Sequence, residues 1–239
     1  MEEIAVVTGG SHGIGRAIVA RLAKEGYLTA NLDISNPPEG QNGVFRKTNL
    51  SDHEETESVL RELAADYRIT RIVNNVGTIQ PGAIETASFA EVSTAVGLNW
   101  IPAVQALQVA LPGMRQAGFG RIVNISSRSA LGRPERSAYS MTKGGVIGLT
   151  RGWASELAEA GITVNAIGPG PIETEMFIGT HPPGDPKRGK VLSLVPMRRM
   201  GQPEEVAQAA AFFLDSRSGY ITGQVMFVCG GMSLGLQLP

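Results

Sequence analysis

The chain has 239 residues, of which 42% are hydrophobic and 18% charged, and its formal net charge is −1 at pH 7. This composition is typical of a globular protein, and the near-neutral charge excludes the basic surface of a nucleic-acid-binding or polybasic membrane-binding protein. Cys229 is the single cysteine, so an internal disulfide and a cysteine zinc cluster are excluded, and the three scattered histidines indicate no metal site.

No targeting segment or membrane span is predicted. The chain begins Met-Glu-Glu, which is acidic where a signal peptide would be basic, and no apolar run approaches the roughly 18 residues of a spanning helix. No repeat, low-complexity tract or linker divides the sequence. We therefore expect a cytoplasmic protein with a single domain over residues 1–239 and no membrane or nucleic-acid partner.

The chain opens with a strand, a glycine-rich turn and a helix. Residues 3–8 form a short β-branched run that leads directly into the glycine-rich segment 9–15. Apolar residues at helical spacing follow from Arg16, and Gly26 ends the helix. Glycines in such a turn let the backbone approach a pyrophosphate, which rests on the positive helix N-terminus. This order of elements predicts a dinucleotide-binding loop.

The second strand, residues 27–33, strengthens that prediction. Its last residue is Asp33, 18 positions after Gly15. An acidic residue at about this distance can hydrogen-bond a ribose 2′-hydroxyl. Strand, loop, helix, strand and acid together favour a dinucleotide site over a set of ordinary turns.

Strands and helices alternate along the rest of the chain. Further strands are expected at residues 44–48, 71–77, 121–127, 162–167 and 224–228. Helices are expected over about 51–67, 89–115 with a kink at Pro102, 139 to near 161, and 203–214. Residues 173–200 hold four prolines and show little periodicity. This alternation predicts an α/β fold with a mostly parallel sheet covered by helices on both faces.

Tyr139 and Lys143 are four residues apart, so they share one face of the expected helix. Lowering a phenol pKa from roughly 10 to roughly 7 requires about 4 kcal/mol of preference for phenolate. An ammonium about 4 Å away supplies about that much at an effective dielectric of roughly 20. The pair is therefore a candidate proton donor for a carbonyl oxygen, although the same spacing also occurs on helices without a catalytic role.

On these motifs the chain resembles the short-chain dehydrogenase/reductase family over nearly its full length, and within it the branch of 3-oxoacyl-acyl-carrier-protein reductases. The segments that carry the resemblance are Thr8-Gly-Gly-Ser-His-Gly-Ile-Gly15, Asn74-Asn-Val-Gly77 with Val76 where alanine is usual, the four residues Asn99, Ser127, Tyr139 and Lys143, and Pro169-Gly170. The resemblance implies a single-domain, Rossmann-type doubly wound sheet of seven strands, which binds NAD(H) or NADP(H) at the carboxyl ends of the strands.

The resemblance also implies roles for four catalytic residues. Tyr139 would give or take the substrate proton, and Lys143 would lower its pKa and hold the nicotinamide ribose. Ser127 would hydrogen-bond the substrate oxygen, and Asn99 would position a water next to Lys143. Ser127 lies 12 residues before Tyr139, where the family more often has 13, so Ser126 is an alternative. The phase of the strand end favours Ser127.

By the same resemblance, the cofactor would contact residues from several strand-end loops. These are Gly9, Ser11, His12, Gly13, Ile14, Gly15, Asp33, Asn49, Leu50, Asn75, Val76, Gly77, Ile125, Tyr139, Lys143, Pro169, Gly170, Ile172 and Thr174. The Asp33 carboxylate would repel a 2′-phosphate, so NAD is favoured over NADP. His12 stands where family members that use NADP often carry a basic residue, and Asn49-Leu50 replaces the usual Asp-hydrophobic pair, so NADP stays open.

The function expected is that of an NAD-dependent oxidoreductase that interconverts a secondary alcohol and a ketone. Two alternatives remain: an NADP-dependent reductase of 3-oxoacyl thioesters, and a non-catalytic nucleotide-sensing protein, which would normally lack the Tyr or the Lys. The segment at about 173–200 resembles a substrate lid. Arg128, Arg133 and Arg136 either meet an anionic substrate, or they are solvated loop charges or subunit contacts. Relatives usually form homotetramers, and the same assembly is expected here.

Overall fold

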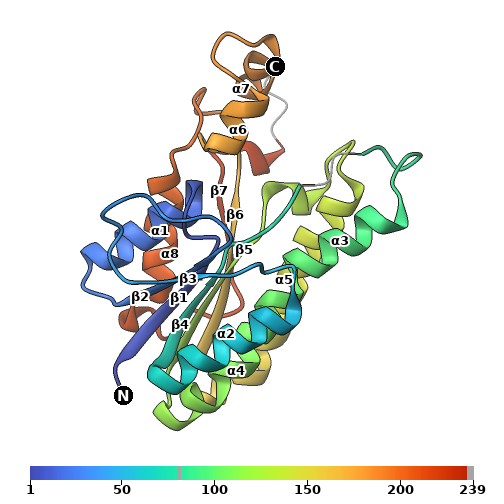
Figure 1. The fold of residues 1–239 in the computed structure, drawn as a ribbon. Helices are drawn as coiled ribbons and strands as arrows, with labels where there is room; N and C mark the ends of the chain where they lie inside the picture. The colour runs from blue at the N-terminus through green and yellow to red at the C-terminus, as the bar shows by residue number, and fades with distance from the viewer. Residues whose placement is uncertain (80–81, 236–239) are drawn as a thin grey trace.

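The computed structural model describes residues 1–79 and 82–235, and these form one parallel sheet between two layers of helices (Figure 1). Seven strands pair in the order β3-β2-β1-β4-β5-β6-β7, and every pair is parallel. The strands are β1 (Glu3–Thr8), β2 (Thr29–Asp33), β3 (Val44–Lys47), β4 (Arg68–Asn74), β5 (Gly120–Ile125), β6 (Ile162–Pro169) and β7 (Val225–Val228). The expected doubly wound α/β fold is confirmed.

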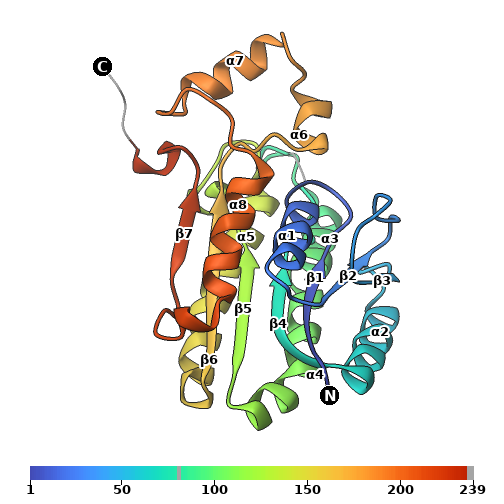
Figure 2. The same ribbon diagram turned by 90° about the vertical axis from the view of Figure 1, so that its left-hand side faces the viewer.

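The helices cover both faces of this sheet. They are α1 (Gly13–Lys24), α2 (His53–Asp66), α3 (Phe89–Asn99), α4 (Ile101–Ala117), α5 (Ser137–Leu157), α6 (Glu175–Thr180), α7 (Pro186–Ser193) and α8 (Pro203–Leu214). The short 3-10 helices are η1 (Arg128–Leu131), η2 (Ala158–Ala160), η3 (Ser216–Ser218) and η4 (Met232–Leu234). Figure 2 shows α1 and α8 together on one face, and α2, α4 and α5 lie on the other.

Each face has its own hydrophobic core, because the central strands of a parallel sheet are buried on both sides. Leu60 and Leu63 of α2 pack with Ile72 and Ile122 under the α2–α4–α5 layer. Ile18 and Leu22 of α1 pack with Phe213 and other residues of α8 on the opposite face. All residues of β2, β5 and β6 are buried. Buried polar side chains in these strands need hydrogen-bond partners, and Asn31, Asn124 and Asn165 each have one, whereas the Thr163 hydroxyl has none among the described residues.

Several boundaries differ from those expected from the sequence. The strand expected at 71–77 runs over Arg68–Asn74, and that expected at 121–127 runs over Gly120–Ile125. In both cases the polar residues after the last strand residue belong to the site loops. The expected helix over 89–115 is two helices, which meet at Trp100 because Pro102 occupies the first turn of α4. Residues 173–200 contain α6 and α7, which weak periodicity concealed.

The expectation that no segment has the length and composition of a membrane span is wrong for one segment. Phe89–Ala117, which comprises α3 and α4, is long and apolar enough by length and composition alone. Buried residues make up 39% of the most apolar 18-residue stretch of this segment. Helix α4 packs against α2 and β4. The break at Trp100 divides the segment into two shorter helices.

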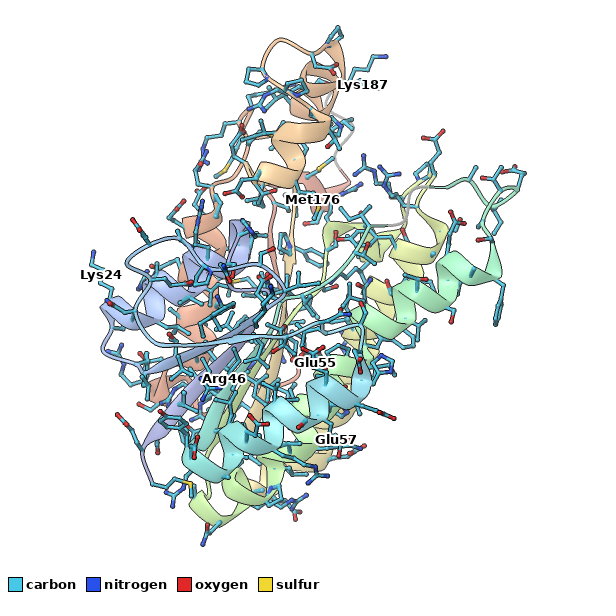
Figure 3. The ribbon with its side chains drawn as sticks, viewed as in Figure 1. Lys24, Arg46, Glu55, Glu57, Met176 and Lys187 are labelled. Atoms are coloured by element: carbon cyan, nitrogen blue, oxygen red, sulfur yellow. The ribbon has the colours of Figure 1, made fainter. Side chains whose placement is uncertain are left out.

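The carboxyl ends of all seven strands lie at one edge of the sheet, below α6 and α7 (Figure 1). The loops after β1, β2, β4, β5 and β6 meet there. Met176 on α6 and Lys187 on α7 mark the segment that overhangs this edge (Figure 3). The candidate site is built from these loops.

Candidate active site

The glycine-rich loop joins β1 to α1 in a conformation that requires its glycines. Gly9 and Gly13 have positive φ angles of 69° and 49°. A Cβ on Gly15 would overlap the Gly9 carbonyl and come within 2.6 Å of the Asn75 amide nitrogen. The backbone can therefore turn tightly and expose the N–H groups at the start of α1 only with glycine at these positions.

Asp33 is held directly beside this loop. Its carboxylate accepts the Ser11 N–H at 3.0 Å and the Ser35 N–H at 2.9 Å, and the residue is only 8% exposed. Asn31, two residues earlier in β2, accepts the Gly10 N–H at 2.9 Å and donates to the Ser11 hydroxyl. These bonds tie the end of β2 to the loop, so Asp33 lies where the sequence predicted an acid.

Asn75 connects the end of β4 to the same loop. Its amide donates to the carbonyls of Thr8 and Gly9, both at 3.0 Å. The Thr8 hydroxyl accepts the N–H groups of Asn75 and Val76 at 3.0 and 3.1 Å. The side chain of Asn75 thus sets the spacing between two neighbouring strand ends.

Ser127, Tyr139, Lys143 and Asn99 converge next to these loops. A Cβ placed on Gly77 would lie 3.0 Å from the Asn99 amide oxygen and 3.2 Å from the Lys143 Nζ, so these three residues adjoin. The Lys143 ammonium donates to the Ile125 carbonyl at 2.8 Å. The Ser127 hydroxyl interacts with the Tyr139 phenol and lowers its pKa. The four residues named from the sequence therefore occupy one region at the strand ends.

The charge state of Tyr139 and Lys143 differs from the expectation. Burial raises the pKa of the Tyr139 phenol, and Ser127, Arg133 and Arg136 oppose that rise without cancelling it. Burial also lowers the pKa of Lys143 to about 8. The predicted lowering of the phenol pKa by Lys143 is therefore wrong for this structure, because removal from water dominates both groups.

The two adjacent serines make different contacts. Ser126 donates its hydroxyl to the Lys143 carbonyl at 2.7 Å, so it fixes the backbone of α5. Ser127 accepts the Ser129 N–H at 3.0 Å and contacts Tyr139. Only Ser127 faces the phenol, which agrees with the strand-phase prediction.

The side chain of Asn99 is fully engaged with its surroundings. Its oxygen accepts the Thr78 N–H at 2.8 Å, and its nitrogen donates to the Thr142 hydroxyl at 2.9 Å and to the Thr78 carbonyl at 3.3 Å. Trp100 donates its indole N–H to the Thr142 carbonyl at 2.7 Å. Asn99 and Trp100 therefore hold the start of α5 against the loop after β4.

The segment before α6 closes over the glycine loop. The Glu175 carboxylate accepts the Gly13 N–H at 3.1 Å and forms an ion pair with Arg16 at 2.8 Å. The methyl group of Thr174 lies 3.1 Å from the position of a Cβ on Gly13. The pKa of Glu175 is lowered, chiefly by a hydrogen bond from its own backbone N–H and further by Arg16, the Gly13 N–H and His12, while burial opposes the change. The N-terminus of α1 thus already holds an anionic group.

The remaining predicted residues lie around this region in different environments. Pro169 ends β6, and the N–H of the following Gly170 donates to the Val228 carbonyl at 2.9 Å. Ile172 is buried in the core beside α8, and Leu50 is buried under the opposite layer. His12 and Asn49 are exposed, and the Asn49 side chain accepts the Ser51 N–H. Ile14 is half-buried at the start of α1.

Sequence reasoning missed several residues that shape the site. Asn31 was detectable as a polar residue in a buried strand, two positions before Asp33. Thr142, Trp100 and Glu175 gave no such signal, because each acts through a partner far away in the sequence.

The residues present fit a nicotinamide dinucleotide. The carboxylate of Glu175 at Gly13 shows that the start of α1 accepts an anion, as a diphosphate requires. The glycine loop leaves no room for a Cβ, and Asp33 ends β2 next to it. Tyr139 and Lys143 lie beyond the loop after β4, where they would face the reacting end of such a cofactor.

Comparisons with known proteins agree with this arrangement. Residues 9–233 match a family model described as enoyl-(acyl carrier protein) reductase. The 3-oxoacyl-[acyl-carrier-protein] reductase FabG of Staphylococcus aureus is 34% identical over 246 residues, which cover 97% of this chain and 98% of that protein.

Two solved structures have the same fold. The ligand-free aldohexose dehydrogenase of Thermoplasma acidophilum has a TM-score of 0.90 and 32% identity, and the match covers 100% of this chain and 96% of that one. A putative NAD(P)-dependent gluconate 5-dehydrogenase of Beutenbergia cavernae with bound NADP has a TM-score of 0.91 and 31% identity, with 98% and 97% of the chains covered.

Proposed function

The chain belongs to the short-chain dehydrogenase/reductase family of NAD(P)-dependent oxidoreductases, and we propose that it interconverts a secondary alcohol and a ketone with Tyr139 as the proton donor and acceptor. The observation that carries this proposal is the convergence of Ser127, Tyr139 and Lys143 beside the glycine loop. A proton donor, a hydrogen-bonding hydroxyl and a cation at one strand-end site are what polarisation of a carbonyl group requires.

In the reduction direction, the phenol of Tyr139 acts as an acid. Because burial raises its pKa, Tyr139 is protonated at neutral pH and can donate to the substrate carbonyl oxygen. Ser127 holds that oxygen by a second hydrogen bond. A bound nicotinamide dinucleotide supplies or accepts the hydride. In the oxidation direction the phenol must lose its proton, and the hydrogen bond from Ser127 and the positive charges of Arg133 and Arg136 favour the phenolate.

Asn99 acts as a positioning residue in this scheme. Its side chain holds the Thr78 backbone and the Thr142 hydroxyl, so it sets where α5 presents Tyr139 and Lys143. Residues that would hold the cofactor are those of the glycine loop, Asp33, the Asn75–Gly77 turn, and the turn from Pro169 to Thr174. The segment 173–200 would act as a substrate lid, and its contact from Glu175 to Gly13 supports that role.

We propose NAD as the preferred cofactor. Asp33 is fixed at the end of β2 by two backbone N–H groups, so a 2′-phosphate there would meet a carboxylate that cannot turn away. The Beutenbergia cavernae structure contains NADP, and His12 is exposed beside the loop, so NADP is the competing assignment.

Paired titrations with NADH and NADPH test this preference. We expect wild type to bind NADH at least roughly tenfold more tightly, since one buried like-charge contact costs a few kcal/mol. Asp33→Ala should shift the ratio toward NADPH, whereas the exposed Asp66→Ala should not change it. A wild-type preference for NADPH would contradict the assignment.

A second candidate is the reduction of 3-oxoacyl thioesters, which the similarity to FabG over 97% of the chain favours. We propose the general alcohol–ketone reaction first, because Ser127 and Tyr139 would act on the ketone group that both substrate classes contain. Oxidation of NADH in the presence of simple ketones tests the first proposal. Turnover restricted to acetoacetyl-CoA and NADPH would favour the second.

We also propose a cytoplasmic homotetramer without membrane association. In the most apolar 18-residue stretch of the α3–α4 segment only 39% of the residues are buried, and a Cβ on Gly148 of α5 would meet no atom within 4 Å among the described residues. Open apolar helix surface of this kind supports contact with another copy of the chain. Light scattering after gel filtration should give the mass of four chains.

A further inference from the structure

Three arginines lie between Ser127 and Tyr139 in the sequence, and two of them, Arg133 and Arg136, act electrostatically on the phenol; we refer to Arg128, Arg133 and Arg136 as the arginine cluster. Arg128 follows Ser127 directly and begins η1, and Arg136 is the N-cap of α5, three residues before Tyr139. Arg133 lies in the turn between them. Over residues 1–79 and 82–235, none of the three forms an ion pair, whereas seven other arginines do.

The cluster is close enough for its members to repel one another. The like charges of Arg136 and Arg128, after burial, lower the pKa of Arg133, and only the Tyr139 phenol and Glu135 oppose this. Arg133 and Arg136 in turn lower the pKa of Tyr139. Their field therefore extends to the reacting group, and an anion held there would relieve the repulsion.

The local backbone gives no stabilising reason for this charge. Arg136 precedes the first turn of α5, where a cation opposes the helix dipole, and that turn holds no acidic residue. Glu135 has a φ of 57°, which is uncommon for a residue other than glycine. Its carbonyl accepts the Gly82 N–H at 3.1 Å and the Arg136 guanidinium at 2.9 Å. Unfavourable backbone of this kind concentrates at functional sites.

We propose that the arginine cluster binds an anionic group of the substrate, so that the enzyme selects hydroxy acids and keto acids over neutral alcohols and ketones of the same size. A guanidinium matches a carboxylate through two parallel hydrogen bonds. The inference rests on the proposed function, because it places the substrate between Tyr139 and these arginines.

Isosteric pairs test the proposal. Wild type would be assayed with NADH and NADPH on 3-oxobutanoate, 4-oxopentanoate and 5-oxohexanoate, each against its own carboxamide. We expect at least one acid to exceed its amide in kcat/KM by roughly tenfold or more, which is the size of a charge-assisted hydrogen bond. A further pair compares kcat/KM for acetoacetyl-CoA with that for the neutral acetoacetyl-N-acetylcysteamine thioester. This pair shows whether the phosphates of coenzyme A, which lie far from the ketone, have the same effect as a nearby carboxylate.

Variants locate the effect. Arg133→Gln and Arg136→Gln should each reduce the acid-to-amide ratio by several-fold, and Arg115→Gln, at the far end of α4, should leave it unchanged. Equal kcat/KM for every charged and neutral pair in wild type would overturn the inference, while turnover of the amides would keep the proposed function. A ratio that is high but insensitive to both variants would also overturn it. Absence of turnover for every pair with either cofactor would reject both the proposed function and the role of the arginine cluster.

Discussion

At the scale of single residues, the site depends on two groups that lose water when the chain folds. Lys143 is 5% exposed and its ammonium has the Ile125 carbonyl as its hydrogen-bond acceptor. Tyr139 is partly exposed, yet its surroundings raise the pKa of the phenol. Burial thus favours the neutral form of both side chains, and the cations around Tyr139 moderate that effect.

The pKa of Lys143 predicts how stability changes with pH. The pKa is about 8 in the folded protein against an ordinary value of 10.5, so between these values the unfolded chain binds the extra proton. The free energy of unfolding should therefore rise with pH in this range, by about 2 kcal/mol from Lys143 between pH 8 and pH 10. The raised pKa of Tyr139 has the opposite effect on stability: it lowers the free energy of unfolding as the pH rises, but only at pH values above about 10.0, the ordinary pKa of the phenol.

Denaturant unfolding of wild type and Lys143→Met at pH 8 and pH 10 measures this contribution. We expect the difference between the two proteins to change in favour of wild type as the pH rises. Lys47→Met, on exposed β3, should give the same pH dependence as wild type. A difference that does not change with pH would show that Lys143 keeps an ordinary pKa.

The positions of the candidate site residues could be predicted from the sequence, but the pKa shifts of these residues could not. Helix periodicity predicts that Tyr139 and Lys143 share one face, and the distance from Gly15 to Asp33 fits a dinucleotide fingerprint, whereas the catalytic roles came from the family resemblance. The pKa directions depend on how much water the fold removes, which no local pattern contains. Strand phase predicts different sides for the two hydroxyls, and the structure has Ser127 at the Tyr139 phenol and Ser126 at the Lys143 carbonyl; the catalytic role of Ser127 stays a prediction.

At the scale of elements, the site is held by helix ends and by the overhanging segment. The start of α1 receives the Glu175 carboxylate, and Arg16 in the first turn of the same helix pairs with it. Arg188 of α7 forms a bidentate contact with Glu173, at 2.8 and 2.6 Å. These contacts connect α6 and α7 to the region that would hold a diphosphate.

The Glu175 contact predicts an effect on nucleotide affinity. Glu175→Gln keeps the side-chain length but removes a negative charge from the N-terminus of α1, so we expect NADH to bind about two- to fivefold more tightly. Fluorescence titration of NADH measures this change. Glu204→Gln, on the exposed first turn of α8, should bind NADH as wild type does. Weaker binding by Glu175→Gln would mean that the carboxylate assists the cofactor.

The junction of α3 and α4 predicts a strong steric effect in α5. A Cβ on Gly145 would overlap the Trp100 indole, whereas one on Gly148 would meet no described atom within 4 Å. Gly145→Ala should lower the free energy of unfolding by about 1–3 kcal/mol. Gly148→Ala should leave it unchanged or raise it by up to about 1 kcal/mol. Equal effects in chemical denaturation would contradict the role of Trp100.

Elements with clear end signals were predictable, and those fixed by tertiary contacts were not. The bounds of α8 match the expectation, because Pro203 and the capping interaction of Gln202 with Glu205 mark its start. α6 and α7 have only six and eight residues, too few to show a period. The close approach of the Trp100 side chain to Gly145 in α5 is a tertiary contact that no local sequence pattern contains.

At the scale of the whole molecule, the parallel sheet brings distant parts of the sequence to one edge. Each crossover returns the chain to the same end of the sheet, so loops separated by more than a hundred residues meet there, as Gly13 and Glu175 do. The alternation of strands and helices was sufficient to predict this architecture. What the loops recognise depends on the arginine cluster and the overhanging segment, whose placement follows from packing and not from periodicity.

The central claim is that Tyr139 transfers the substrate proton, and single-turnover hydride transfer tests it most directly. Enzyme with bound NADH is mixed with a ketone that wild type reduces, and the loss of NADH absorbance is followed in wild type and Tyr139→Phe. We expect the variant, saturated with NADH, to react at least about 100-fold more slowly, as loss of a general acid requires. Equal rates in the two proteins would contradict the claim.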